Sequence, residues 1–449
     1  MDLKLEGRLV AANRAFTISG SRWRNFGVAP LPNGDNTEMQ DDSQNGRRKF
    51  LSSLAGIAGA AGVGIAVGEK PAWAAPNKPT GWPSSLDINA TAPAYNPREL
   101  PKPGEQIHEF DITVDVTKIE ILPLEEHHFY TFNGTLPGPE IRVKEGDWVK
   151  VNLTNKTHDF HTIHWHGIYV PCEMDGVPLG TQWPVGFNQT FTYLWRAQPA
   201  GTHFYHCHNM TNMHIQAGLY GALIIEPKEE DIVRKTFPYE RDYTLILSEV
   251  DTEFLREQMN EMLHMGHIMD AMNGSSKLMA KMDRKMMGWF KDVGTFIQTV
   301  KDGWVPPYHR SRTGPAMRIE PNFFLINGRP YPMTEHMHIK RGENIRVRLI
   351  NAGLMPHFMH LHGHDFWHVC HDGSPLASPV RANTIPVYPG STTDIIIQGT
   401  NPGGWHFHDH SDLSIMNNGK SPGGMMTMLM YEDAEEAGFT FKEIIALDS

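Results

Sequence analysis

Four short clusters of histidine are the residues of this sequence best suited to bind metal ions. Each holds a His-x-His doublet, and the doublets are His164-Trp165-His166, His206-Cys207-His208, His360-Leu361-His362 and His408-Asp409-His410. In a strand, residues i and i+2 point to the same face, so each doublet can present two imidazoles together. Eight imidazoles suit a cluster of about three metal ions, and imidazole favours copper and zinc. One doublet would be weak evidence, whereas four in equivalent places predict a metal centre.

Cys207 favours copper over zinc. It lies inside one doublet, with His161 upstream and His214 downstream. Two imidazoles and one thiolate with a weak axial position describe a blue, electron-transferring copper site. Because the same cysteine has a doublet histidine on either side, the two centres would be joined by a short covalent path. His158 is an alternative to His161 as the upstream ligand.

The composition agrees with copper and excludes other classes of protein. The chain has 25 His and 24 Met but only 3 Cys, which favours copper over zinc–thiolate or iron–sulfur centres and rules out a disulfide scaffold. The 40 Lys and Arg against 51 Asp and Glu give a formal charge of −11, which argues against a nucleic-acid binder. With 40% hydrophobic residues the chain can build a full core, so global disorder is excluded.

An internal repeat predicts the elements that position these residues. Residues 144–155 resemble residues 340–351, and the same spacing relates His161 to His357. Short β-type runs separated by Gly and Pro turns are typical of β-sandwiches. Two copies of one unit therefore predict an all-β chain of two β-sandwich domains, at residues 101–228 and 237–449.

The second copy carries an insert of different composition at about 251–315. Methionines from Met259 to Met272 recur at helical spacing, with His264 and His267 among them. This pattern predicts a helical insert. Thioethers prefer Cu(I), but methionines at this spacing also serve as adaptable packing. Metal handling, a lid over the copper site and plain packing all stay open, also for the later methionines Met425, Met426, Met428 and Met430.

Residues 1–74 are typical of an export signal. Paired arginines at 47–48 precede a short apolar run and an Ala-Trp-Ala-Ala cleavage site. The arginine pair resembles the twin-arginine type of signal, and the run is too short and too rich in Gly and Ala to span a membrane comfortably. We expect a linker at 75–100 and an exported, periplasmic or extracellular protein. Met39 is an alternative start, because the polar stretch before the arginines is unusually long.

With these motifs the sequence resembles the multicopper oxidases, the family of laccases, ascorbate oxidase and bacterial cuprous oxidases. The motifs that carry the resemblance are 161–167, 203–208, 357–364 and 405–410. The resemblance implies two cupredoxin-like Greek-key sandwiches with about four copper ions per subunit. It also implies one-electron oxidation of a phenolic or cuprous reductant coupled to four-electron reduction of O2 to water. Two-domain relatives form trimers with the cluster between domain 1 of one chain and domain 2 of the next, so a homotrimer is expected.

The resemblance also assigns roles to single residues. The type 2 copper ligands would be His164 and His360. The type 3 pair would be bound by His166, His206, His208, His362, His408 and His410. The type 1 ligands would be His161, Cys207 and His214, with Leu219 at the axial position; since leucine cannot coordinate, we expect a relatively high type 1 potential. Asp175 matches the family's proton-relaying aspartate, with a plain Asp-Gly turn as the alternative.

The sequence departs from the family pattern in the second copy. Asp409 takes the place that Cys207 holds in the first copy, so we expect the second copy to lack a blue copper and His357 to be structural or to support a ligand. Cys172 and Cys370 are left over. An exported compartment permits a bridge between them, but we expect two separate buried thiols.

Two other functions compete with the oxidase. A copper nitrite reductase also has two cupredoxin domains with its blue site in the first, but it needs a lone type 2 copper with three histidines. A periplasmic copper-storage or shuttle protein would leave the repeated doublets unexplained. The sequence does not identify the physiological electron donor.

Overall fold

The computed structural model describes residues 99–260 and 319–437 of the chain. Both ranges belong to one compact unit, Pro76–Ser449. The expected signal region at 1–74, nearly all of the linker and most of the Met-rich insert lie outside the described residues. None of the helices in the described ranges is both long and apolar enough to cross a bilayer.

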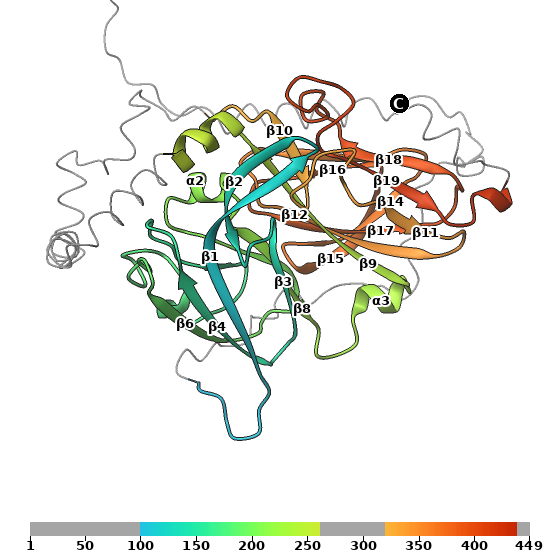
Figure 1. Ribbon diagram of the computed structural model, residues 1–449. Coiled ribbons are helices and arrows are strands. Elements are labelled where there is room, and N and C mark those ends of the chain that lie inside the picture. Colours follow the sequence, from blue (N-terminus) through green and yellow to red (C-terminus); the bar gives the residue numbers. More distant parts are fainter. Residues whose placement is uncertain (1–98, 261–318, 438–449) are drawn as a thin grey trace, which may run out of the picture. The chain divides into compact units, whose positions relative to one another are not determined.

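The first copy of the repeat folds as a sandwich of two four-stranded sheets (Figure 1). Their strand orders are β2-β1-β4-β6 and β3-β8-β7-β5, with β1 parallel to β4 and antiparallel to β2. The elements are β1 (Ile107–Leu122), β2 (Glu125–Phe132), β3 (Gly138–Lys144), β4 (Trp148–Asn155), β5 (His164–His166), η1 (Cys172–Met174), β6 (Thr190–Arg196), β7 (Gly201–His206), α2 (Thr211–Gln216) and β8 (Tyr220–Glu226).

The second copy folds as a larger sandwich with the same core pairing. Its sheets have the orders β10-β9-β12-β17-β14-β15 and β11-β19-β18-β13-β16. Here β9 runs parallel to β12, as β1 does to β4. The elements are α3 (Ile232–Thr236), β9 (Arg241–Val250), β10 (Phe323–Ile326), β11 (Met337–Ile339), β12 (Asn344–Asn351), β13 (His357–Leu361), β14 (Phe366–His371), β15 (Ser374–Ala382), β16 (Thr384–Val387), β17 (Thr392–Gln398), β18 (Gly404–Asp409), β19 (Met426–Tyr431) and η3 (Glu435–Ala437). The predicted all-β class is confirmed.

The strands form where apolar side chains alternate with polar ones. In β4, Val149, Val151 and Leu153 are fully buried, while the residues between them are partly exposed. This period of two is what a half-buried strand requires. The central strands of the second sandwich are buried on both faces instead, and β17 reads as a continuous run of buried residues. One apolar cluster fills the second sandwich, and another fills the first and extends to residues of β9, β10 and β12.

Several of the methionines that the structure describes are packed in the interior. Residues 252–260 are helical, and Met259 at their end is only 2% exposed within the core of the first sandwich. Met426, Met428 and Met430 form a small buried cluster with Tyr331. Met262 and the later members of the stripe, with His264 and His267, lie outside the described residues.

A buried ion network joins the two sandwiches. Arg346 in β12 contacts Asp394 in β17 at 2.6 Å between Nη2 and Oδ2. Thr202 in β7 donates to the same oxygen at 3.0 Å, and Arg348 donates to the Thr202 hydroxyl at 2.8 Å. Although burial opposes it, the two guanidinium groups hold the pKa of Asp394 below its usual value. The strand that ends at His206 is thus tied to the second sandwich.

Replacing Asp394 with alanine is expected to lower the free energy of unfolding by about 3 kcal/mol, because two buried guanidinium groups lose a shared carboxylate and keep Asp231 and Asp242 as close partners. Chemical denaturation of the purified chain measures this loss. Lys235→Ala, which removes an exposed ion pair with Glu230, serves as the control and should cost far less. Equal losses in the two variants would show that the network contributes no more than a surface pair.

Candidate metal centres

His161, Cys207 and His214 meet in one buried site in the first sandwich. The Cys207 Sγ lies 3.6 Å from Nδ1 of His161 and 3.2 Å from Nδ1 of His214. His161 is held by a β-bridge to Val185, Cys207 directly follows β7, and His214 lies in α2. All three side chains are buried, with their donor atoms within 4.8 Å of one another. Two imidazole nitrogens and one sulfur therefore converge on one point.

The far nitrogens of both imidazoles are held by residues that the sequence reasoning missed. Nε2 of His161 lies 2.8 Å from Oγ1 of Thr157, and Nε2 of His214 lies 3.1 Å from Oδ2 of Asp159. The Tyr130 ring also packs edge-on against both imidazoles, with centroids 4.9 and 5.3 Å away. Such outer contacts fix the ring orientation and leave Nδ1 for a metal.

The electrostatics of the two imidazoles differ. Burial lowers the pKa of His161 to about 3. Burial acts in the same direction on His214, but there Cys207 and the Asp159 carboxylate outweigh it and raise the pKa to about 10. His158, the alternative ligand, instead packs against the Phe187 ring at 4.3 Å.

Leu219 lies directly beside the site. Its carbonyl accepts from the Cys207 N–H at 3.0 Å, and its own N–H donates to the His214 carbonyl at 2.9 Å. The side chain is fully buried in the core of the first sandwich. It therefore offers apolar surface and no donor atom.

Four histidines of the first sandwich, called the first quartet, form a second cluster: His164, His166, His206 and His208. Ring centroids from His164 to the other three are 5.7, 5.3 and 5.2 Å away. Nδ1 of His164 bonds the Asp175 carbonyl at 2.8 Å, and Nδ1 of His206 bonds the Cys207 carbonyl at 3.0 Å. Each contact fixes the tautomer and leaves Nε2 for a metal. Burial lowers the pKa of His166 to about 4 and of His206 to about 3, so both are neutral and able to bind metal at pH 7.

Asp175 is both a turn residue and a neighbour of the first quartet. Its Oδ1 lies 3.3 Å from Nδ1 of His164, and one third of its side chain is exposed. Gly176 follows with φ of +79°, and a Cβ there would lie 1.8 Å from the Ile163 carbonyl oxygen. Only glycine fits, so the Asp-Gly pair builds a tight turn against the strand that carries His164.

Four histidines of the second sandwich, called the second quartet, form a third cluster: His360, His362, His408 and His410. His360 and His408 are paired across β13 and β18, and the His362 and His408 Nε2 atoms lie 3.0 Å apart. His360 and His408 again bond carbonyls through Nδ1, at 2.8 and 2.9 Å. Unlike the first quartet, this one is open, because His362 and His410 are exposed. In the described ranges, the ring contacts of each quartet link it to no member of the other.

The second sandwich has no cysteine where the first has Cys207. Asp409 stands there, and its Oδ2 lies 2.8 Å from Nδ1 of His357. Nε2 of His357 lies 3.2 Å from Oε2 of Glu249, a residue that the sequence reasoning missed. We call Glu249, His357 and Asp409 the acid–histidine clamp. Its two carboxylates lie on opposite sides of the ring, one at each ring nitrogen, so the three side chains do not converge on a single point as metal ligands would.

The two remaining cysteines are free, and one expectation about them is wrong. Cys370 is buried in β14, but Cys172 is exposed in η1. Cys172 follows the buried Pro171 and is itself exposed, so this thiol is not part of a core.

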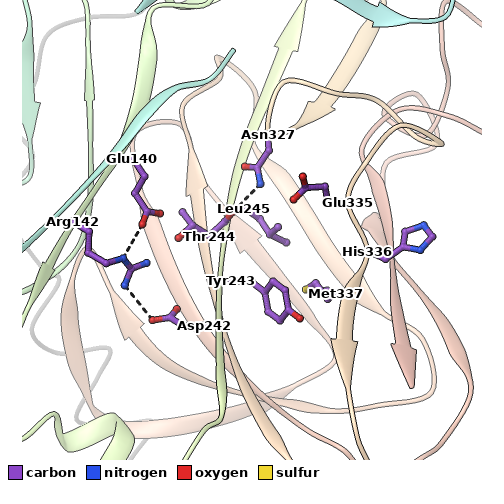
Figure 2. A pocket seen from close by; sticks show the side chains of 10 residues that line it. All are labelled: Glu140, Arg142, Asp242, Tyr243, Thr244, Leu245, Asn327, Glu335, His336 and Met337. Atoms are coloured by element: carbon purple, nitrogen blue, oxygen red, sulfur yellow. Dashed lines mark hydrogen bonds and ion pairs between the residues drawn. The ribbon is translucent and has the colours of Figure 1, made fainter. Parts of the chain in front are cut away.

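A polar pocket of about 250 Å³ lies away from these clusters (Figure 2). It is lined from β3 and β9 and by residues of the 327–337 segment, and it includes none of the clustered histidines. Figure 2 shows Arg142 between Glu140 and Asp242, with contacts of 2.8 and 3.5 Å. The positive charge in this pocket is therefore already paired.

The donor sets fit copper. One site offers two imidazole nitrogens and a thiolate beside a side chain that cannot coordinate, which is the pattern of electron-transferring copper. The quartets offer only imidazole, which suits copper as well as zinc.

Comparisons with known proteins agree. Two family profiles described as multicopper oxidase match residues 113–230 and 304–433. The chain is 27% identical over 368 residues to a copper resistance protein A homolog of Pseudomonas syringae pv. tomato, covering 79% of this chain and 54% of that protein. It is 28% identical over 368 residues to copper resistance protein A of Escherichia coli, covering 78% and 52%. A blue copper oxidase structure from Nitrosomonas europaea is 33% identical, covering 73% of this chain and 87% of that one, with a TM-score of 0.58.

These sandwiches and their donor sets define a copper protein of the cupredoxin class. The chain belongs to the multicopper oxidase family, whose members include enzymes such as laccase and L-ascorbate oxidase. Its cofactor is copper, which family members bind at type 1, 2 and 3 sites. The chain spans about half the length of the curated relatives it matches.

The clamp predicts a pH dependence of stability. Burial opposes it, but hydrogen bonds to Asp409 and Glu249 raise the pKa of His357 to about 9, against 6.5 in the unfolded chain. A raised histidine pKa stabilises the fold fully below pH 6.5, and that contribution is lost as the pH rises through 9. It amounts to something on the order of 3 kcal/mol.

Denaturation midpoints of the parent chain and of His357→Gln, measured between these two pH values, check this. The difference between the two curves should shrink with rising pH, while His214 contributes equally to both. Parallel curves would contradict a protonated His357.

Proposed function

We propose that this protein is an oxidase that takes single electrons from a small reductant at a blue copper and delivers them to O2 at a trinuclear copper cluster. The observation that carries the proposal is the position of Cys207. It meets His161 and His214 on one side, while His206 and His208, its sequence neighbours, belong to the first quartet. Bound copper would supply one-electron oxidation at the first site and four-electron reduction of O2 to water at the cluster.

Different residues of the chain would serve as ligands of the different copper sites. Cys207 would ligate the type 1 copper with His161 and His214, and its backbone links that site to the quartet through two peptide bonds. Leu219 would leave the axial position without a ligand atom, which favours a high potential. By the family's pattern, His164 and His360 would hold the type 2 copper. The type 3 pair would be held by His166, His206, His208, His362, His408 and His410.

Asp175 would hold a proton for the reaction. O2 reduction to water consumes four protons, and the partly exposed Asp175 carboxylate lies 3.3 Å from Nδ1 of His164. A carboxyl group that touches both solvent and a ligand imidazole can accept a proton from water and pass it inward.

The cluster would form between subunits. Each chain presents one half-buried quartet and one open quartet, and the open one exposes the imidazoles of His362 and His410. A cyclic arrangement in which each second quartet meets the next chain's first quartet completes every cluster. We propose a homotrimer on this basis and on the behaviour of two-domain relatives.

Cuprous ion is the reductant that we favour. The curated relatives are named copper resistance protein A, and the Met-rich stretch contains the thioethers that Cu(I) prefers. Phenols are the alternative, since laccases are also relatives. The paired arginines at 47–48 and the apolar run after them support export by the twin-arginine route to the periplasm or beyond.

Two other functions fit the site less well. A nitrite reductase needs a single copper held by three imidazoles, whereas this chain has two quartets. A copper-storage protein would not need a cysteine that bridges two centres. Oxygen consumption separates the oxidase from both.

Oxygen uptake by the copper-loaded protein, with Cu(I) and with a phenol, tests the oxidase and its reductant. The comparison variant lacks residues 261–287, a deletion that starts after Met259 because that side chain packs in the core. We expect Cu(I) oxidation to fall at least about tenfold and phenol oxidation to persist, since thioethers bind Cu(I) selectively.

The other outcomes are equally decisive. Unchanged rates with both reductants would make the methionines packing or a lid and the phenol the better substrate. No oxygen uptake with either reductant would exclude the oxidase and direct attention to nitrite.

Mixing two inactive variants tests the shared cluster. His166→Ala removes a ligand of the first quartet, and His362→Ala removes one of the second. Neither should turn over O2 alone. If clusters form between chains, dissociated and remixed equal amounts should regain activity at about a quarter of the interfaces. Clusters built within one chain would give no recovery, and a monomeric mass in sedimentation would also exclude the trimer.

A further inference from the structure

The acid–histidine clamp occupies, in the second sandwich, the place of the blue-copper residues in the first. His357 corresponds to His161 and Asp409 to Cys207 in the repeat. The backbone agrees, because Asp409 N–H donates to the Met425 carbonyl at 3.0 Å, as Cys207 N–H does to Leu219. Even the aromatic contact recurs, with Phe324 edge-on to His357 as Tyr130 is to His161. In the second sandwich, the acid–histidine clamp therefore occupies the position that would bind the type 1 copper in the first.

All four carboxylate oxygens of the clamp have partners. On Asp409, Oδ2 faces His357, and Oδ1 accepts from the N–H groups of Phe358 and Ser411 at 2.8 and 3.3 Å. On Glu249, Oε2 faces His357 at 3.2 Å, and Oε1 accepts from the N–H groups of Leu354 and Met355. The side chains of the clamp are 0% exposed. A fully satisfied buried network of this kind rigidifies the segments that it joins.

Glu249 also dictates the turn before His357. A Cβ on Gly353 would lie 2.1 Å from Oε2 of Glu249, so the turn passes the carboxylate only with glycine there. The turn and the carboxylate therefore fit one another closely.

The clamp joins three strands and both sheets of the second sandwich. Glu249 lies in β9 of the six-stranded sheet, while His357 and Asp409 lie in β13 and β18 of the other. The same two strands carry His360 directly opposite His408, and His362 and His410 lie just past their ends. Asp409 stands between His408 and His410 in sequence, and its side chain points to the core while theirs contact one another.

Apart from the clamp, the contacts of the second quartet within the described ranges come from its own sheet. The His362 and His410 side chains are exposed, and their backbone N–H groups donate to the His406 and Phe358 carbonyls. His360 is oriented by the Asn383 carbonyl and the Thr384 hydroxyl, and His408 by the Asp409 carbonyl. The spacing of its imidazoles therefore depends on how β13 and β18 are held from beneath.

We propose that the acid–histidine clamp positions the second quartet, so that half of a copper cluster is pre-formed on each chain. The proposal rests on the function proposed above. It makes Asp409, His357 and Glu249 positioning residues for cluster copper, although none of them touches the metal. In the first sandwich, a bound type 1 copper would cross-link the segments that carry its ligands. In the second sandwich, the acid–histidine clamp cross-links the corresponding segments.

The test is copper retention in the assembled, copper-loaded protein. Glu249→Gln keeps the size of the side chain but removes its charge, and the side chain contacts His357 and the turn at 353–355 rather than the quartet itself. Asp409→Asn removes the acceptor facing Nδ1. During titration with a copper chelator, blue absorption reports the type 1 site, and electron paramagnetic resonance with total copper reports the cluster. We expect cluster copper to be lost at roughly 10- to 100-fold lower chelator concentration in both variants, with the blue site unchanged.

A core variant separates positioning from stability. Val347→Ala removes buried volume in β12, which belongs to the same sandwich, and it is not part of the clamp. It should lower the unfolding temperature without changing cluster retention. If Glu249→Gln and Asp409→Asn lower stability but hold cluster copper as the parent does, the clamp is structural only and the proposal is wrong.

Failure of the proposed function gives a different result. A parent protein that binds only the blue copper has no cluster to position, which would overturn both proposals. A parent with a full cluster and variants that retain it would overturn the clamp alone. If Asp409→Asn does not fold, Glu249→Gln, farther from the quartet, decides by itself.

Discussion

The pleat of one strand constrains this whole protein. β7 ends at His206, and Cys207 and His208 follow it directly, with successive side chains pointing to opposite sides. The sulfur faces the buried His161 and His214, while its two neighbours belong to the first quartet. The geometry of both sites therefore depends on the position of β7. The Thr202 contacts with Asp394 and Arg348 hold it from the second sandwich.

The two sandwiches show how one scaffold accommodates different charges at one internal position. In the first, a sulfur and two imidazoles converge through Nδ1. In the second, a single imidazole stands between two carboxylates and bonds through both nitrogens. The parallel pairing of two core strands and the backbone hydrogen bond from the residue inside the doublet recur in both sandwiches. A buried charge is tolerated when every polar atom is paired, and the second copy meets this condition with protein groups alone.

Local spacing made the histidine doublets, the repeat and the all-β class predictable. His161, Cys207 and His214 could also be grouped, because the doublet fixed where the cysteine points. Thr157, Asp159 and Tyr130 escaped prediction, since their contacts depend on loop conformation and on the register between β1 and β2. Glu249 escaped for a similar reason, as it reaches His357 from the opposite sheet. The exposure of Cys172 follows from a surface turn that its repeat position did not reveal.

The exposure of the second quartet to solvent has a consequence for the assembly of the chain in solution. Imidazoles that face solvent in a fixed spacing bind metal with part of a full coordination shell, and the remainder must come from another molecule. If the missing donors lie on another copy of the chain, a copper ion ligated by both copies links the subunits. Mass action then links assembly to metal supply, because any ligand that binds only the joined form favours joining. The free copper concentration would set the fraction of chains in the assembled form, and a low copper concentration would favour dissociated chains.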